Sequence, residues 1–228
     1  MPRPLTAELK ERRVDACQEL LKQYEAGGNG FLGRTVTGDE TWVHNHQPGT
    51  KKASKEWRHT SSPKQKKFRT QPSARKVMLT LFWDERGVIL EHYMPRGNTV
   101  TSATYADLLK NHLLRAIKSK RSGCLGTGVL LQHDNAQPHT ACSTVATIQD
   151  LAFECVPHPL YSPDLATSDF HVFGPLKEAM GGKSFRSDEE VKQAVHKWLR
   201  SQPKEFFLEV CMHFQRARTL VWNEMETT

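Results

Sequence analysis

Hydrophobic positions follow two different periods along the chain, and the changes between them mark the expected elements. Residues 6–26 carry apolar side chains at the three-to-four-residue spacing of an amphipathic helix, which a Gly-Gly pair at 27–28 ends. By contrast, β-branched and aromatic side chains dominate residues 31–45, 76–84 and 88–94. We therefore expect three strands there, the last two joined as a hairpin by the turn at 84–87.

The second half of the chain alternates short strands with longer helices. The pattern predicts strands at 129–133 and 153–156 and helices at 101–120, 139–151, 164–181, 187–201 and 204–222. A hairpin-rich first half followed by β-α-β units predicts an α/β fold, a mixed sheet flanked by helices. We expect an N-terminal helix and linker over residues 1–30, then one domain over 31–228. That domain would carry a long insertion at 46–75, and loops of such length are usually functional or disordered.

Composition describes a protein with one core and no membrane segment. The 228 residues are 37% hydrophobic with a mean hydropathy of −0.60, and no apolar run has the length of a membrane span or the form of a secretory signal. Five cysteines are scattered without a C-x-x-C pair: Cys17, Cys124, Cys142, Cys155 and Cys211. This usage indicates reduced thiols in the cytosol or nucleus rather than disulfides or a zinc site.

The net charge of +7 is concentrated in one segment. Residues 51–76 contain ten Lys and Arg side chains and a single acid, Glu56, so this segment carries +9 and the rest of the chain −2. Such a concentration favours contact with a polyanion. A solvated loop that contacts nothing would have the same composition.

Three acidic residues from distant parts of the chain suggest a metal centre. Asp39 lies inside V-T-G-D-E-T-W, Asp134 inside L-L-Q-H-D-N-A-Q-P-H-T-A, and Asp169 inside Y-S-P-D-L-A-T-S-D-F. Carboxylate oxygens brought together repel one another unless a hard cation such as Mg²⁺ or Mn²⁺ lies among them. Two such ions about 4 Å apart can activate water and stabilise the leaving oxygen of a phosphodiester. The sequence thus predicts metal-dependent phosphoryl transfer on nucleic acid.

Other polar residues near these acids receive different interpretations. Glu40 follows Asp39 on a strand, so its side chain should point to the opposite face. Asp164 would lie about 140° from Asp169 around a helix, which disfavours a shared ion. His133, Asn135 and His139 flank Asp134. We expect the histidines to have structural roles or to orient that carboxylate by hydrogen bonds, and Asn135 to hydrogen-bond near the scissile phosphate.

The three motifs, in this order and with 34 residues between Asp134 and Asp169, resemble the catalytic domain of mariner-type transposases of the Tc1/mariner superfamily. The resemblance runs from about residue 6 to about residue 207. The chain is also similar to the transposase-derived part of a histone methyltransferase fusion, in which Asn replaces the third acid.

The resemblance implies a ribonuclease H-like fold of the retroviral integrase and transposase type. Asp39, Asp134 and Asp169 would bind two Mg²⁺ or Mn²⁺ ions and act in DNA strand cleavage and strand transfer. The expected partners are DNA and a second copy of the chain, in the nucleus, with no membrane and no small-molecule substrate. The homodimer would form through the basic loop and the N-terminal linker.

DNA contacts are expected from the cations of the basic loop: Lys51, Lys52, Lys55, Arg58, Lys64, Lys66, Lys67 and Arg69. The family's paired helix-turn-helix modules, which read transposon ends, are expected to be absent, because the chain begins near the linker that follows them. Two alternatives remain open: a catalytically silent, domesticated or relic module for DNA binding and dimerisation, and a structure-specific DNA repair nuclease.

Overall fold

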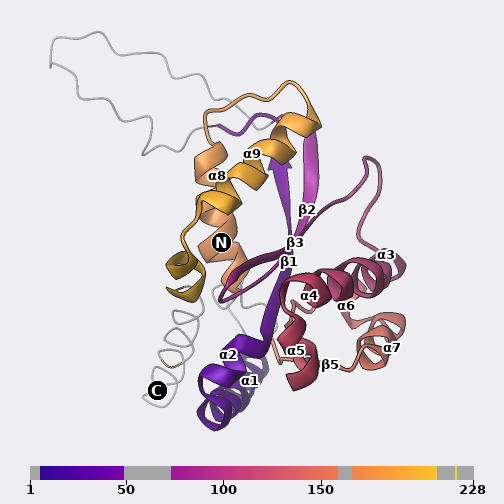
Figure 1. Cartoon of the computed structure of the whole chain (residues 1–228), viewed down its shortest axis with the longest axis vertical. Coiled ribbons are helices and arrows are strands. Elements are labelled where there is room, and N and C mark those ends of the chain that lie inside the picture. Colours follow the sequence, from indigo (N-terminus) through magenta and orange to yellow (C-terminus); the bar gives the residue numbers. More distant parts are fainter. Residues whose placement is uncertain (1–5, 49–72, 159–165, 210–218, 220–228) are drawn as a thin grey trace, which may run out of the picture.

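The computed structural model describes residues 6–48, 73–158, 166–209 and 219. Its centre is a five-stranded mixed sheet in the order β3-β2-β1-β4-β5 (Figure 1). The strands are β1 (Thr35–His44), β2 (Lys76–Asp84), β3 (Gly87–Tyr93), β4 (Val129–Gln132) and β5 (Phe153–Cys155). The first three strands pair antiparallel, whereas β1, β4 and β5 are parallel. The predicted mixed α/β sheet is therefore confirmed.

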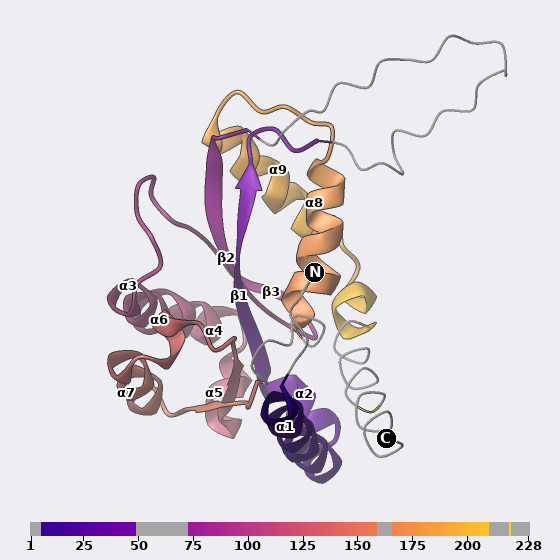
Figure 2. The same cartoon turned by 180° about the vertical axis from the view of Figure 1, so that it is seen from behind.

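Helices cover both faces of this sheet (Figures 1 and 2). They are α1 (Ala7–Gly27), α2 (Asn29–Arg34), α3 (Ser102–Asp107), α4 (Leu114–Lys120), α5 (Ser122–Thr127), α6 (Gln137–Thr140), α7 (Cys142–Asp150), α8 (Gly174–Met180) and α9 (Asp188–Ser201). In the described residues, the π-helical turns η1 (Leu108–Leu113) and η3 (Ser168–Phe173) precede α4 and α8, and residues 204–209 are also helical. None of the described helices combines the length and hydropathy that a membrane span requires.

Four details differ from the sequence-based expectations. Residues 31–34 end a short helix instead of opening β1, because Phe31 and Leu32 pack into a small cluster with Leu20 of α1. Residues 122–127 form α5, which buries Cys124, where the glycine-rich sequence suggested only a break. The helix expected over 101–120 is continuous but becomes π-helical in its middle. The helix expected over 139–151 is interrupted where Ala141 has an extended backbone.

Two apolar clusters fix the sheet between its helical layers. One joins the face carrying Leu79, Leu81 and Trp83 to α8 and α9. The other joins the opposite face, including Phe82, to α3, η1, α4 and α7. Beside Phe82, Gly38 has no side chain for a steric reason, since a Cβ there would collide with the Phe82 ring. Packing thus sets the position of β1 one residue before Asp39.

The pairing of β1 with β4 is short and ends next to two of the predicted acids. β4 pairs with β1 only from Thr35 to Thr37, whereas the β1–β2 register continues to His44. The two parallel strands therefore diverge after Thr37 and Gln132. Asp39 and Asp134 follow these two positions by two residues each, one on either side of the fork.

A buried ion pair ties the β2–β3 turn to the end of α4. Arg121 donates to both oxygens of Asp84, at 2.6 and 2.9 Å, and the Asp84 side chain is only 1% exposed. We predict that Arg121→Ala lowers the free energy of unfolding by about 3–5 kcal/mol, because it leaves the buried Asp84 charge without its main partner. Chemical denaturation would measure this. Arg12→Ala breaks an exposed pair with Glu8 and should cost less than about 1 kcal/mol; equal losses in the two variants would contradict the role of burial.

His92 makes stability depend on pH. Burial, followed by the neighbouring His112 ring at 5.1 Å, lowers the pKa of His92 in the folded protein. The unfolded chain therefore binds more protons, and stability should fall as pH drops through the unfolded value of about 6.5 towards the lower folded value. We predict that His92→Gln shows a smaller difference in melting temperature between pH 7.5 and pH 5.5 than the wild type. An equal or larger difference would be inconsistent with this assignment.

Candidate active site

The fork in the sheet brings together side chains from three separate elements. Asp39 extends from β1, Asp134 follows β4, and Asp169 lies in η3, which packs against β1. The position of η3 is fixed by a buried hydrogen bond in which the Trp83 indole donates to Ser168 Oγ at 3.0 Å. Asp169 is thus presented by a segment anchored to the sheet through its immediate neighbour.

The three carboxylates affect one another electrostatically. Burial raises the pKa of Asp39 well above its usual range, and the charges of Asp169, Glu40 and Asp134 raise it further, against a hydrogen bond from the Glu40 N–H. Burial and the charge of Asp134 also raise the pKa of Asp169, whereas Lys177 opposes them. The ionised form of Asp39 is therefore costly in this position, and a nearby cation would relieve that cost.

The carboxylate oxygens suit a hard divalent cation, although the side chains do not form a preformed metal-binding site. Within the described ranges, no three His, Cys, Asp or Glu side chains form a preformed metal-binding group. Two of the acids are instead held by the protein: Asp39 Oδ1 accepts from the Glu40 N–H at 2.7 Å, and Asp134 Oδ1 accepts from the Ala136 N–H at 3.0 Å. Carboxylate oxygens in mutual repulsion fit Mg²⁺ or Mn²⁺ by their chemistry.

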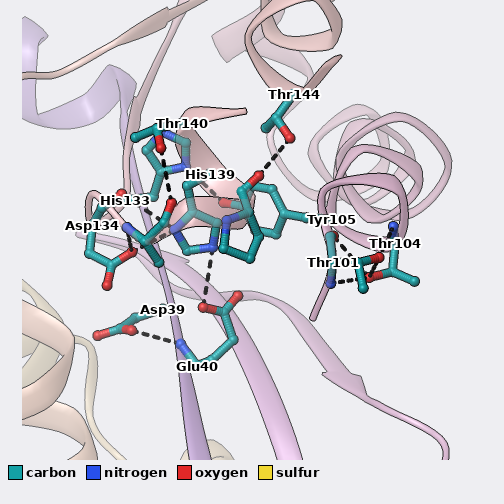
Figure 3. A network of polar contacts seen from close by, with 12 residues as sticks. Asp39, Glu40, Thr101, Thr104, Tyr105, His133, Asp134, His139, Thr140 and Thr144 are labelled. Atoms are coloured by element: carbon teal, nitrogen blue, oxygen red, sulfur yellow. Dashed lines mark hydrogen bonds and ion pairs between the residues drawn. The ribbon is translucent and has the colours of Figure 1, made fainter. Parts of the chain in front are cut away.

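A buried imidazole links Asp134 to Glu40 on the far side of β1 (Figure 3). His139 Nδ1 lies 2.6 Å from Asp134 Oδ1, and its Nε2 lies 3.4 Å from Glu40 Oε2, an ion-pair contact without the alignment of a hydrogen bond. Burial acts to lower the pKa of His139, but the carboxylates of Asp134 and Glu40 outweigh it and raise the pKa to about 9. His139 is thus a cation at neutral pH that holds both carboxylates.

Aromatic packing holds this imidazole in place. The His139 ring lies 4.1 Å from the Tyr105 ring and 5.0 Å from the nearly parallel His133 ring. Tyr105 in turn bonds to His133 Nδ1 at 3.0 Å. Burial, followed by the charge of His139, lowers the pKa of His133 to about 4, so His133 is neutral. Only one of the two stacked rings therefore carries charge.

The pKa of Asp134 is shifted in the opposite direction to the pKa of Asp39. Burial acts to raise the pKa of Asp134, but the hydrogen bonds from His139 and the Ala136 N–H outweigh it and lower the pKa. One acid of the site is stabilised as a carboxylate by the protein itself, while Asp39 is not. Of these two acids, Asp39 is therefore the one that gains more from a bound cation.

Comparisons with known proteins agree with this geometry. The family model for Transposase (partial DDE domain) matches residues 47–127. The mariner Mos1 transposase of Drosophila mauritiana is 36% identical over 209 residues, which are 91% of this chain and 59% of that protein. The crystal structure of the Mos1 catalytic domain superimposes with a TM-score of 0.80 at 31% identity, over 98% of this chain and 97% of that one. The chain belongs to the mariner transposase family.

Within the mariner family, the chain corresponds to part of the longer relatives. The histone-lysine N-methyltransferase SETMAR of Homo sapiens is 30% identical over 207 residues, 91% of this chain but 30% of that protein. The Mos1 paired end complex with Mn matches with a TM-score of 0.89 at 33% identity, over 98% of this chain and 64% of that one. The chain thus spans about three fifths of Mos1 and under a third of SETMAR.

The remaining predicted site residues of this mariner-family chain lie in several places. Asn135 Nδ2 donates to the His158 carbonyl oxygen at 2.6 Å, which links the segment after β4 to the segment after β5. Glu40 points away from Asp39 as strand alternation predicted, but its contact with His139 was missed. Strand alternation predicts that Glu40 lies on the face opposite Asp39, but no feature of the sequence predicts that His139 contacts Glu40 there. Asp164 and the predicted DNA-binding cations, Lys51, Lys52, Lys55, Arg58, Lys64, Lys66, Lys67 and Arg69, lie outside the described residues.

The repulsion at Asp39 can be tested without any enzymatic assay. We predict that Asp39→Asn raises the melting temperature at neutral pH in EDTA, because the amide keeps the acceptor for the Glu40 N–H and removes the buried charge. The folded pKa of Asp39 is raised, so the advantage should vanish as pH falls and the wild-type carboxyl becomes protonated. Differential scanning calorimetry would measure both effects. The exposed Asp150→Asn is the matched control and should change little; a lower melting temperature for Asp39→Asn would refute the prediction.

Proposed function

We propose that this chain is the catalytic part of a mariner-type transposase, which cleaves and joins DNA strands with the help of divalent metal ions. The observation that carries the proposal is that Asp39, Asp134 and Asp169 lie within electrostatic reach of one another at the fork, where burial, followed by the charges of Asp169 and Asp134, raises the pKa of Asp39. A fold that brings acids from three separate elements close together must overcome their mutual repulsion. Such an arrangement is expected where the acids bind a cation.

The structural relatives support this proposal. Mos1 was crystallised in paired end complexes with Mn and with Mg, in a pre-cleavage transpososome and in a strand transfer complex. Its catalytic domain was also solved with raltegravir and either Mn or Mg. Divalent metal dependence is therefore a property of the relatives that this fold and this donor set fit.

Each residue of the proposed site has a distinct task. Asp39, Asp134 and Asp169 would hold two Mg²⁺ or Mn²⁺ ions, which when bound polarise the scissile phosphate and favour attack by an oxygen nucleophile. His139 fixes the rotamer of Asp134 by the 2.6 Å hydrogen bond, and Glu40 holds the other side of the ring. Lys177 lines the same cavity as Asp169 and places a positive charge where a DNA phosphate would approach.

The wider organisation is part of the proposal. Residues 1–30 would form the linker helix, 31–228 the catalytic domain, and 46–75 a basic insertion that contacts DNA and a second copy of the chain. The excess of nine positive charges in residues 51–76 supports the DNA contact. A homodimer acting on DNA in the nucleus is consistent with the paired assemblies named for Mos1.

A nicking assay tests the activity itself. We predict that the purified protein converts supercoiled plasmid to nicked circles with Mn²⁺ and that Asp134→Ala loses at least 100-fold in rate, because one of the three proposed metal ligands is removed. Asp150→Ala, an exposed acid on α7, is the matched control and should nick at the wild-type rate. Nicking that survives Asp134→Ala would reject the assignment. An inert wild-type protein that still binds DNA would favour a silent binding module, and cleavage confined to flaps or overhangs would favour a repair nuclease.

Metal binding gives a second test that needs no DNA. We predict that His139→Gln weakens Mn²⁺ binding roughly tenfold to hundredfold, because residues that orient metal ligands typically have effects of that size. Isothermal titration calorimetry on wild type and variant would measure the affinity. His196→Gln removes a histidine–carboxylate pair with Glu91 that lies outside the fork, so it should bind Mn²⁺ like the wild type. Unchanged affinity in His139→Gln would show that His139 does not position a ligand.

A further inference from the structure

Among the residues that the structure describes, helices cover one face of the sheet end that carries the C-terminal half of β1 and leave its other face open. In both views α8 and α9 lie beside this half of β1 and β2, whereas α3, α4, α6 and α7 lie beside the other half (Figures 1 and 2). Strand alternation puts Trp42 and His44 of β1 on the face opposite the α8–α9 cluster, and their cross-strand partners Met78 and Lys76 share that face. All four side chains are only partly buried or exposed.

Two cavities around this end of the sheet, each also lined by residues from the side of α8 and α9, meet at the same pair of side chains. One, of about 380 Å³, is lined by Asp169, Lys177 and Glu40 and extends to Trp42 and Met78. The other, of about 410 Å³, begins at Trp42 and Met78 and extends to Tyr93, Arg96 and Lys192. Because Trp42 and Met78 line both cavities, the cavities adjoin one another. Together we call them the sheet-end groove, which reaches from the proposed active site to the start of α9.

The far end of the sheet-end groove combines cations with aromatic rings. The Lys76 ammonium lies 4.0 Å from the centre of the Trp42 ring, and the Lys192 ammonium lies 5.8 Å from that of Tyr93. A positively charged groove with interleaved aromatic rings is the usual surface for a nucleic acid strand. These contacts hold the lysine side chains over the groove.

Acidic groups at this end reduce the positive charge without cancelling it. Asp188 pairs with Arg96 at 2.7 Å and with Arg75 at 3.7 Å, and it is 21% exposed. Lys192 also pairs with the exposed Glu189 at 2.6 Å. The four cations at this end therefore outnumber the carboxylates of Asp188 and Glu189 by about two charges; the cations are Arg75, Lys76, Arg96 and Lys192. Asp188 also holds the two arginines close together.

We propose that the sheet-end groove binds the phosphates of the DNA strand that leaves the active site, with Lys76, Arg96 and Lys192 as the contacts farthest from Asp169. This inference rests on the proposed function, since it is the position of Asp169 at the other end that identifies the occupant as a DNA strand. A polyanion is favoured over an acidic protein segment because cations occur along the whole groove, from Lys177 through Lys76 to Lys192.

The test is the salt dependence of DNA binding by the full chain. Fluorescence anisotropy would follow single-stranded and duplex 30-nucleotide probes from 50 to 300 mM salt, with wild type and the triple variant Lys76→Gln, Arg96→Gln, Lys192→Gln. Each phosphate contact contributes about 0.7–0.9 to the slope of log affinity against log salt. We expect the triple variant to bind at least tenfold more weakly at 100 mM salt and to have a slope shallower by about 2.

The matched control neutralises three exposed cations on η1 and α4: Lys110→Gln, Arg115→Gln and Lys118→Gln. This variant carries the same net charge as the groove variant and should keep the wild-type slope. Melting temperatures of both variants would show that they are folded. The charge-preserving variant Lys76→Arg, Arg96→Lys, Lys192→Arg should restore the slope, which a loss through misfolding would not.

Asp188→Asn provides a test in the opposite direction. It removes the central negative charge of the groove while Ser187 still caps α9, so DNA affinity should rise about threefold or more at 100 mM salt. A gain in affinity cannot come from damage to the fold.

The outcomes separate this inference from the proposed function. Equal slopes for the two triple variants and the wild type would overturn the groove, even if the intact protein nicks plasmid. A shallower slope in the groove variant alone would support it, even if no nicking occurs. Loss of self-association by sedimentation in the groove variant, with its DNA binding unchanged, would assign the surface to a second copy of the chain and would also overturn the proposal.

Discussion

Repulsion among three carboxylates is the constraint on which this site depends. The β1–β4 fork and the anchored η3 segment bring Asp39, Asp134 and Asp169 within electrostatic reach of one another. Burial, followed by the charges of the other acids, raises the pKa of Asp39 and Asp169. The fold tolerates this cost because the elements that carry the acids are fixed elsewhere, by the two apolar clusters and by the Trp83–Ser168 hydrogen bond. A cation among the carboxylates would turn a local source of strain into a binding site.

The protein stabilises one of the three acids with its own charge. His139 is cationic at neutral pH and donates to Asp134, while its other nitrogen faces Glu40 across β1. This arrangement orients Asp134 before any metal arrives, and it connects the two strands of the fork where their backbone pairing has ended. Within the part of the chain that the structure describes, the donor to Asp39 is the Glu40 backbone N–H, so the preorganisation of the site is unequal. The cavity beside Asp169 adjoins the rest of the sheet-end groove. A DNA strand bound at Asp169 could therefore continue along this positively charged groove.

Much of the fold could be predicted from the sequence, because it depends on local patterns. Alternation in β1 correctly placed Asp39 and Glu40 on opposite faces, and the apolar run of β4 correctly placed Asp134 just beyond its end. Local patterns failed where tertiary packing decides: residues 31–34 are helical because Phe31 and Leu32 pack beside Leu20. The Glu40–His139 contact and the meeting of two cavities at Trp42 join residues far apart in sequence. No spacing rule predicts such contacts without the strand register.

The central claim is that the three aspartates share divalent ions. Anomalous diffraction from crystals soaked in Mn²⁺ tests it most directly, since it locates manganese independently of any activity. We expect anomalous peaks at the fork, with carboxylate oxygens of Asp39, Asp134 and Asp169 about 2.0–2.6 Å from them, the range for hard divalent cations. Well-ordered crystals with no manganese at the fork, and with Asp134 still bonded only to His139 and the Ala136 N–H, would contradict it.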